Sequence, residues 1–404
     1  MLLKLAWRNI WRNRNRSLIT MSAIASAVLL AVATVSLQQG VWGHLIKNLV
    51  SLYTGYAQVH AKGYWEEQTL ENSFEIDKAV EQQVAGTAGV NAIAHRLESF
   101  ALASSGDKTR GCLVVGINPS EEERLTQLSQ KIQSGHMLKS DQDGALVAEG
   151  LAEKLDLKLG DTLVLLTQSF YGSTAAMKTP IRGLLHFGSP DLNNQIAYIP
   201  INRAQYWLDA SGRATSLVVG LERPENLPAV ARSLKNSLPK TFEALTWKEM
   251  MPEINQHIEA DSAGMYIMLG VLYLLIAFGI FSTLLMMLAE RQREFGMLNA
   301  LGMQPWSIAR VVLAETVFLT LCGSLAGLLL SYPLVWYLAE HPIQLGGDMA
   351  EIYAKFGFEA IFPATIKAKI FIDQTLVVLI VGLVLAIYPV WRVLRLNAVE
   401  AMRH

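Results

Sequence analysis

Four long apolar stretches divide the chain into membrane and aqueous parts. Residues 18–41, 265–289 and 375–391 carry no charge, and residues 306–339 carry one acid, Glu315, near their start. Each stretch is long enough, as a helix, to cross a hydrocarbon core of about 30 Å. The pattern predicts an α-helical membrane protein with four transmembrane helices.

The chain between the first two spans has a different pattern. In residues 44–262 charge rises, Gly and Pro recur, and no apolar run approaches the length of a span. Alternating and helix-periodic segments are mixed, which predicts a large α+β domain inserted between helices 1 and 2. The Ser-, Gly- and aromatic-rich stretch Thr167–Thr179 predicts an extended hairpin or a mobile loop, where a partner could bind. Strands are expected at 56–61, 92–103, 112–117, 145–148, 162–167, 195–199 and 216–221, and helices at 76–84, 119–132, 149–155, 203–210 and 227–238.

The first seventeen residues are basic and amphipathic. They hold five basic residues and no acid, with Trp7 and Trp11 on a separate stripe, as expected of a helix lying in the membrane interface. The positive charge places the N-terminus in the cytoplasm. Four spans then bring the basic C-terminal tail to the same side and make the large domain extracytoplasmic. A cleaved signal peptide ending at Ala31–Ala33 is the alternative, but the apolar run continues past that site.

Between the second and third spans the sequence reads ERQREFGMLNALG, from Glu290 to Gly302. On a helix its charges cluster at three- and four-residue spacing, and an apolar face follows. Gly302 is a typical stop signal, and Pro305 suits the first turn of the next helix. We expect a short amphipathic helix at the inner membrane surface; a charged loop with helical ends is the alternative. The charged cluster is Glu290, Arg291, Arg293 and Glu294, and the apolar face is Phe295, Leu298 and Leu301.

Two features of the third span bear on packing and function. Gly323 and Gly327 form a G-x-x-x-G pair, which favours close helix packing either between subunits or within one chain. Glu315 is an acid inside a span, a position that is often functional. Because it lies near the cytoplasmic end, we expect it to reach the interface or to pair with Arg310 or Arg291 rather than to transport a solute.

Composition and motifs exclude several functions. Hydrophobic residues make up 51% of the chain and charged residues 17%. The net charge of −1 lacks the excess of basic residues that is typical of nucleic-acid-binding proteins. No phosphate-binding loop and no H-E-x-x-H motif is present, and the eight histidines are scattered. The two cysteines, Cys112 and Cys322, fall in a polar region and in a span, so we expect no disulfide between them. We therefore expect no catalytic residue, metal or cofactor in this chain.

Three segments resemble ABC transporter permeases of the MacB/LolC–LolE/FtsX class. Glu290–Gly302 is similar to the coupling helix through which this class contacts its ATPase. Tyr388–Arg403 is similar to the family's Y-P-x-W-R ending, with Ala398 in place of the usual proline. The passage Ala148–Asp161 is similar to a helix-to-strand segment of LolC/LolE-type permeases and related pumps. The layout of one span, an outer domain and three further spans also matches.

The resemblance implies a division of the chain and a set of partners. A separate cytoplasmic ATPase dimer would bind ATP and Mg, contact the coupling helix, and drive work outside without moving a solute through the spans. The implied residues are Glu290, Arg291, Arg293, Glu294, Phe295, Gly296, Leu298, Leu301 and Gly302. The implied parts are an interfacial helix 1–17, transmembrane helix 1 at 18–43, a periplasmic MacB-like core domain 44–262, transmembrane helix 2 at 263–289, the coupling helix 290–304, transmembrane helix 3 at 305–339, a periplasmic loop 340–373, transmembrane helix 4 at 374–391 and a cytoplasmic tail 392–404.

The resemblance also ranks the functions. Release of lipoproteins from the bacterial inner membrane is favoured, because LolC/LolE-type permeases have a separate ATPase and an outer domain of this size. Acyl chains would then enter between span one and span two of facing subunits, where Ala23–Ala33 is lined with small residues, and Trp at Ala27 or Ala31 should block them. The alternatives are MacB-like extrusion with a periplasmic adaptor, FtsX-like control of a cell-wall hydrolase, and a scaffold without an ATPase. A second copy or a paralogous permease, membrane lipid, and a carrier or adaptor are the other expected partners.

Overall fold

The computed structural model describes residues 2–12, 14–140, 142–347 and 361–395. The chain forms two compact units, and each is described by itself. One contains residues 1–43, 257–344 and 361–404, and the other residues 44–256 and 345–360. The segment Met349–Phe358, where the sequence favours an amphipathic helix, and the tail from residue 396 lie outside the described residues.

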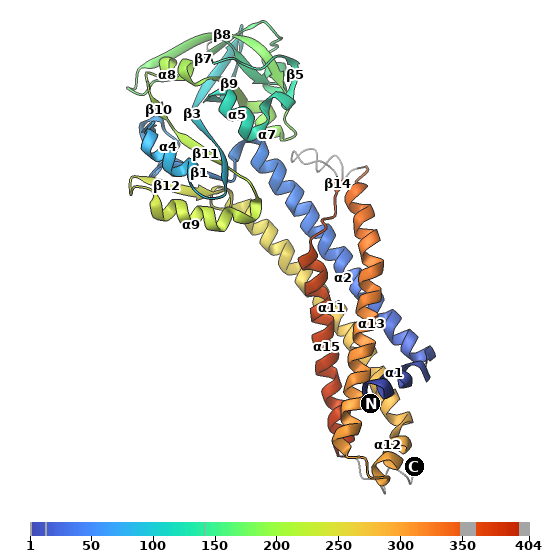
Figure 1. Cartoon of the computed structure of the whole chain (residues 1–404). Coiled ribbons are helices and arrows are strands. Elements are labelled where there is room, and N and C mark those ends of the chain that lie inside the picture. Colours follow the sequence, from blue (N-terminus) through green and yellow to red (C-terminus); the bar gives the residue numbers. More distant parts are fainter. Residues whose placement is uncertain (1, 13, 141, 348–360, 396–404) are drawn as a thin grey trace. The chain divides into compact units, whose positions relative to one another are not determined.

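The first unit is a bundle of long apolar helices. Four described helices are long and apolar enough to cross a membrane, as the sequence predicts, and Figure 1 shows them side by side. They run beyond the predicted spans, because polar turns continue them at their ends. The elements of the unit are α1 (Leu2–Arg12), α2 (Arg14–Leu49), α11 (Pro252–Glu290), α12 (Gln292–Ala300), α13 (Pro305–Glu340), β13 (Ile343–Gln344), β14 (Ile361–Phe362) and α15 (Ala368–Leu394).

Helix α13 packs closely against α2 at the two glycines of its G-x-x-x-G pair. A Cβ at Gly323 would lie 2.8 Å from the Cβ of Ile24, and one at Gly327 would lie 2.7 Å from the backbone oxygen of Ala25. Only a residue without a side chain allows the two backbones to approach this closely. Of the two alternatives left open by the sequence, the glycines serve packing within one chain.

Polar side chains join α2 to α11 near both ends of the region where these two helices pack together. Arg16 forms an ion pair with Glu290. The hydroxyl of Thr20 donates to that of Thr283 at 3.1 Å. Toward the other end, the side chains of Gln38 and Trp42 each donate to Asp261 Oδ2 at 2.8 Å.

Since α2 runs through Ala31–Ala33 without a break and buries Ala31 in the bundle, this segment fits a membrane span better than a cleavage site.

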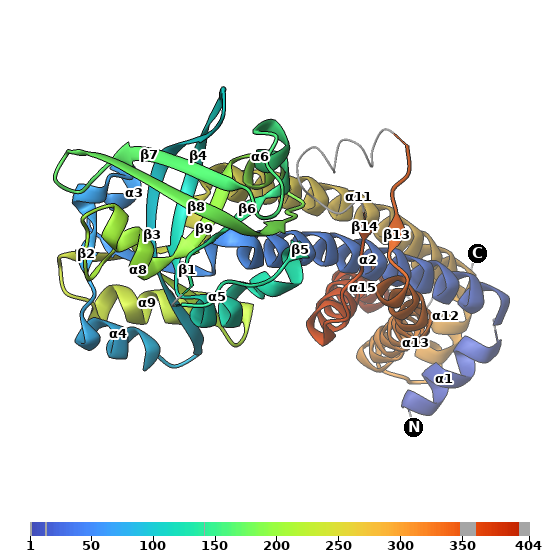
Figure 2. The same cartoon turned by 90° about the horizontal axis from the view of Figure 1, so that it is seen from above.

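The second unit is built around one highly branched sheet. Strand β3 is sixteen residues long and belongs to two parts of it. Its second half closes a six-stranded ring in the pairing order β3-β4-β9-β6-β8-β7-β3. Its first half continues an open sheet through β11, β1 and β12. Figure 2 shows the ring strands gathered together. The strands are β1 (Ala57–Ala61), β2 (Phe74–Glu75), β3 (Val90–Ser105), β4 (Lys108–Ile117), β5 (Ile132–Gly135), β6 (Ala145–Ala148), β7 (Thr162–Gln168), β8 (Thr174–Leu185), β9 (Ile196–Pro200), β10 (Arg213–Ala214), β11 (Ser216–Leu221) and β12 (Phe242–Thr246).

Short helices accompany the sheet, and apolar side chains fill the ring. Leu97, Leu163 and Ile199 are among its fully buried residues. Cys112 is buried there too, and burial raises the pKa of its thiol to about 12; both cysteines are free. Thr167–Thr179 contributes to the β7–β8 hairpin, as the sequence suggested. The helices are η1 (Val50–Thr54), α3 (Tyr64–Glu67), η2 (Leu70–Asn72), α4 (Lys78–Ala85), α5 (Pro119–Thr126), η3 (Leu128–Lys131), α6 (Glu149–Lys154), α7 (Pro190–Gln195), α8 (Ile201–Trp207), η4 (Pro224–Asn226), α9 (Leu227–Ser237) and α10 (Trp247–Met250).

Candidate functional site

The segment between α11 and α13 is a short, separate helix. Helix α11 ends at Glu290, and Arg291 leaves helical geometry with φ −98° and ψ 5°. Helix α12 then runs to Ala300 and is closed by Gly302, whose φ of +94° favours a residue without a side chain. Pro305 occupies the first turn of α13, where its missing N–H costs nothing.

A buried ion pair anchors this helix to α13. Both carboxylate oxygens of Glu315 accept hydrogen bonds of 2.8 Å from Nη1 of Arg291. Glu315 is 1% exposed and Arg291 6%. The Arg291 guanidinium also lies 5.1 Å from the ring centroid of Phe295 and donates to Glu294 at 3.1 Å. Of the two partners that the sequence proposed for Glu315, the structure selects Arg291, whereas Arg310 donates to Ser307.

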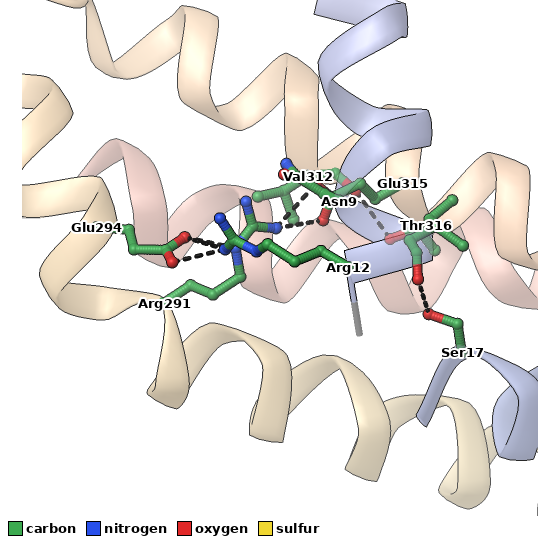
Figure 3. A network of polar contacts seen from close by, with 9 residues as sticks. Asn9, Arg12, Ser17, Arg291, Glu294, Val312, Glu315 and Thr316 are labelled. Atoms are coloured by element: carbon green, nitrogen blue, oxygen red, sulfur yellow. Dashed lines mark hydrogen bonds and ion pairs between the residues drawn. The ribbon is translucent and has the colours of Figure 1, made fainter. Parts of the chain in front are cut away.

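The N-terminal helices complete the network, which Figure 3 shows from close by. From α1, Asn9 donates to Glu315 Oε1 at 2.6 Å, and Arg12 donates to both oxygens of Glu294 at 2.5 and 2.7 Å. From α2, Arg16 pairs with Glu290. Two basic residues of the N-terminal segment, Arg12 and Arg16, therefore contact acids of the 290–302 segment. The sequence analysis did not predict these contacts. The basic residues of 1–17 and the acids of 290–302 are complementary in charge, and this was the signal that could have indicated them.

The ion pair with Arg12 stabilises the charged form of Glu294. Partial burial raises the pKa of this carboxyl, but hydrogen bonds from Arg12 and Arg291 outweigh it and hold the pKa below its usual value. Glu294 therefore stays ionised throughout the neutral range. A small cavity of about 30 Å³ lies beside the network and is lined by Asn9, Arg16, Glu290, Arg291 and Glu315, among others.

The apolar face of α12 is divided between the chain's interior and its surface. Phe295 is 2% exposed and packs with Leu288, Ile308 and Val393. Gly296 is buried as well. By contrast, Leu301 is 84% exposed and Leu298 37%. This arrangement corrects part of the sequence interpretation: Phe295 and Arg291 hold α12 in place in this conformation and are not presented to a partner.

The exposed side of α12 carries both apolar side chains and a cation. It consists of Arg293, Met297, Leu298 and Leu301, and we call it the outer face of α12. Exposed leucine and methionine beside a cation are typical of a protein-binding surface. In the part of the chain that the structure describes, no three His, Cys, Asp or Glu side chains are grouped to hold a metal ion.

Comparison with known protein families matches most of the chain to two models. Residues 17–237 match the MacB-like periplasmic core domain, and residues 266–398 match the FtsX-like permease C-terminal region. Together the two models include most of each unit and the whole 290–302 segment.

Individual relatives are distant but extend over most of the chain. A lipoprotein-releasing system transmembrane protein LolC from Xylella fastidiosa is 23% identical, covering 97% of this chain and 95% of the relative. A lipoprotein-releasing system transmembrane protein LolE from Haemophilus influenzae is 22% identical over 76% of this chain and 74% of its own. A macrolide export ATP-binding/permease protein MacB from a Shewanella species is 21% identical over 99% of this chain but only 60% of its own.

Proposed function

Because the chain belongs to the ABC transporter permeases that join a MacB-like periplasmic core domain to an FtsX-like permease region, we propose that it transmits work from a separate ATPase to the periplasm. In this proposal both termini are cytoplasmic, and the large domain lies outside the inner membrane. ATP and Mg are bound by a cytoplasmic ATPase dimer, not by this chain. A second copy or a paralogous permease completes the membrane unit.

The observation that carries the proposal is the construction of α12. Its inner side is held by the Arg291–Glu315 pair and by Phe295, while its outer face carries exposed Leu298 and Leu301. A partner that moves the outer face would therefore displace a helix fixed to α13 and, through Arg12, to α1. Rigid contacts of this kind transmit movement, since packed interfaces shift between discrete arrangements rather than deforming continuously.

We propose release of lipoproteins from the inner membrane as the work performed. The LolC relative aligns nearly end to end with this chain, whereas the MacB relative has a further part that this chain does not match. Extrusion of peptides or small molecules through a periplasmic adaptor is the second candidate, supported by the MacB-like core domain.

The small residues of α2 differ in whether they pack inside the bundle or lie on its surface. Ala27 and Ala31 are 4% and 0% exposed and pack inside this chain's own bundle, so Trp there would disrupt packing rather than block an entry. The surface of α2 instead exposes Ser22, Ala23 and Ser26. We propose that acyl chains pass along this small-residue face, between facing permease subunits.

The function is tested by trapping the cargo. A photoreactive residue at position 26 of α2, or at Tyr171 in the β7–β8 hairpin, is introduced in living cells, and captured species are identified by mass spectrometry. Tyr171 is 80% exposed and belongs to the large domain. A matched control carries the probe at Leu376 of α15, which is 52% exposed and therefore accepts a bulky residue without disrupting the bundle.

We expect triacylated lipoprotein to be captured from position 26 and a soluble carrier or the cargo protein from position 171. Capture of an adaptor or an outer-membrane channel in their place would support extrusion, and capture of a wall hydrolase would support hydrolase control. If depletion of every cognate ATPase left the captured species unchanged, the chain would act as a scaffold and the coupling proposal would be wrong.

A further inference from the structure

Helix α1 packs against α13 and has two different sides (Figure 2). Its inner side is buried, since Ala6 is 0% exposed and Ile10 7%. Asn9 lies on the same side and donates a hydrogen bond to Glu315 at 2.6 Å. The hydroxyl of Ser17 in α2 donates to the backbone oxygen of Ile10 at 2.9 Å. The inner side of α1 is therefore fixed to the helices around it.

Two cations lie on the outer side of α1, one helical turn apart. Lys4 and Arg8 are both exposed. Neither side chain forms an ion pair or a hydrogen bond in the part of the chain that the structure describes. Because successive residues of an α-helix are about 100° apart, Arg12 falls beside Arg8 on the same side, and it binds Glu294. Lys4 and Arg8 are thus the members of this basic stripe that remain available to an external anion.

Two tryptophans lie on one flank of these cations. Trp7 and Trp11 follow each other around the helix beside Lys4, and their ring centroids are 6.2 Å apart. Trp7 also packs edge-on against Phe318, in the apolar part of α13, with 5.8 Å between the centroids. Trp11 is 57% exposed. This flank of α1 therefore faces the boundary of the hydrocarbon core, where tryptophan is favoured.

The other flank of α1 faces away from the hydrocarbon core. It carries Arg12, which donates to Glu294 of α12 (Figure 3), and α12 lies between the second and third spans. Lys4 and Arg8 thus lie between an aromatic flank and a polar one. In a bilayer the phosphate groups lie at this boundary between hydrocarbon and water.

The acids of the network beside α1 are already paired with other cations. The pairs are Glu290 with Arg16, Glu294 with Arg12 and Arg291, and Glu315 with Arg291. Residues 1–17 contain no acid. The outer side of α1 is therefore positive, which favours contact with an anionic membrane surface.

We propose that the outer side of α1 binds the phosphate groups of anionic phospholipids, in the leaflet on the α12 side of the membrane. Lys4 and Arg8 supply the charge, at about a fivefold gain in affinity for each cation. Trp7 and Trp11 hold the helix at the depth where these cations reach the phosphates.

Lipid bound at this site would also stabilise the position of α12. The same helix holds Glu315 through Asn9 and Glu294 through Arg12, so α1 cannot leave the bundle without breaking both contacts. Anionic lipid would thus act on the segment to which the proposed function assigns the ATPase contact. The lipid site itself does not depend on an ATPase.

Hydrogen exchange of the full chain in lipid nanodiscs, without an ATPase, tests this proposal. The amides of residues 2–12 and 292–300 are followed in phosphatidylcholine alone, with phosphatidylglycerol rising to half of the lipid, and in phosphatidylcholine with added inorganic phosphate. Because no ATPase is present, the outcome is independent of the proposed function.

Three variants accompany the wild type. Lys4→Gln with Arg8→Gln removes both charges, and Lys4→Arg with Arg8→Lys keeps the charges while exchanging the side chains. The matched control, Arg232→Gln with Lys240→Gln, removes two exposed cations of the large domain. All four side chains are exposed, so each variant should fold.

We expect phosphatidylglycerol to slow exchange in both segments of the wild type, of the charge-preserving variant and of the control. The loss of two cations should weaken lipid binding about 25-fold, so the glutamine variant should show little slowing even at the highest phosphatidylglycerol content.

Each other result would contradict a specific part of the proposal. Slowing confined to residues 2–12 would overturn the link to α12. Equal slowing by inorganic phosphate would show that the anion is soluble and would overturn the lipid source. The site itself would be overturned by no slowing in the wild type, by slowing that persists in the glutamine variant, or by its loss in the charge-preserving variant.

Discussion

Glu315 determines how the 290–302 segment is held, because it is the buried acid that both Arg291 and Asn9 contact. Its position inside a predicted span first indicates a functional acid, and its geometry shows a structural anchor at the start of α13. Burying a charge is tolerated only when a partner of good geometry compensates it.

Replacing Glu315 by Gln should leave the buried Arg291 with only the partly exposed Glu294 as its counter-charge. Removing one partner of a buried pair costs about 3–5 kcal/mol, so we expect a large loss of unfolding free energy in detergent. The matched control, Glu340→Gln, alters an exposed acid at the other end of α13 and should be neutral. The double variant Arg291→Met with Glu315→Leu should recover much of the loss. A stable Glu315→Gln protein would contradict the anchoring role.

The Arg12–Glu294 pair should behave differently, because both side chains are about half exposed. Exposed pairs contribute about 0–1 kcal/mol, so Arg12→Gln should hardly change stability. Since the pKa of Glu294 is lowered in the folded protein, its contribution is complete above the ordinary value of about 4.5. It is lost as pH falls through the lower folded value.

Acid titration of unfolding stability measures this contribution. The difference between wild type and Glu294→Gln should be constant from neutral pH to about pH 5 and should shrink below it. A difference that instead changed between pH 6 and 8 would show that another group governs this contact.

At the scale of elements, close helix packing is the property most easily tested. Gly323→Leu would force a side chain into Ile24 of α2, and overpacking of this kind costs about 1–3 kcal/mol. Gly279→Leu is the matched control, since α11 leaves open space there. We expect a lower melting temperature for Gly323→Leu alone, with the oligomeric state unchanged. A change of oligomeric state at wild-type stability would instead assign the glycines to a subunit interface.

Elements with a strong local pattern were predictable from the sequence. The uncharged spans and the strands at Ala145–Ala148 and Ser216–Leu221 follow from apolar runs of the appropriate length. The sequence suggested a hairpin only as far as Thr179, and it missed the second half of β8, residues 180–185, whose pairing with β5 and β6 is non-local. The ring closed by β3 depends on non-local pairing, which no short window of sequence contains.

The candidate site, like the sheet, depends in part on contacts between residues that are far apart in the sequence. The sequence identified the 290–302 segment and Glu315, because charges interrupt an apolar pattern there. It could not separate the inner from the outer side of α12, since Phe295 and Leu301 have equal hydrophobicity and differ only in what covers them. The contacts of Arg12 with Glu294 join residues 282 positions apart, beyond any periodicity.

For the whole molecule, coupling requires that an ATPase press on the outer face of α12 while the inner side transmits the movement. Leu301 is the most exposed large apolar side chain of this segment, so it should lie at the centre of that contact. Phe295, six residues earlier, should lie outside it.

Photocrosslinking from these two positions in intact cells is the most direct measurement. We expect a probe at position 301 to capture an ABC ATPase and one at position 295 to capture none. The captured partner should carry the phosphate-binding loop that this chain lacks. Absence of any ATPase at position 301, in cells where the wild-type chain is active, would show that the outer face of α12 is not the ATPase contact.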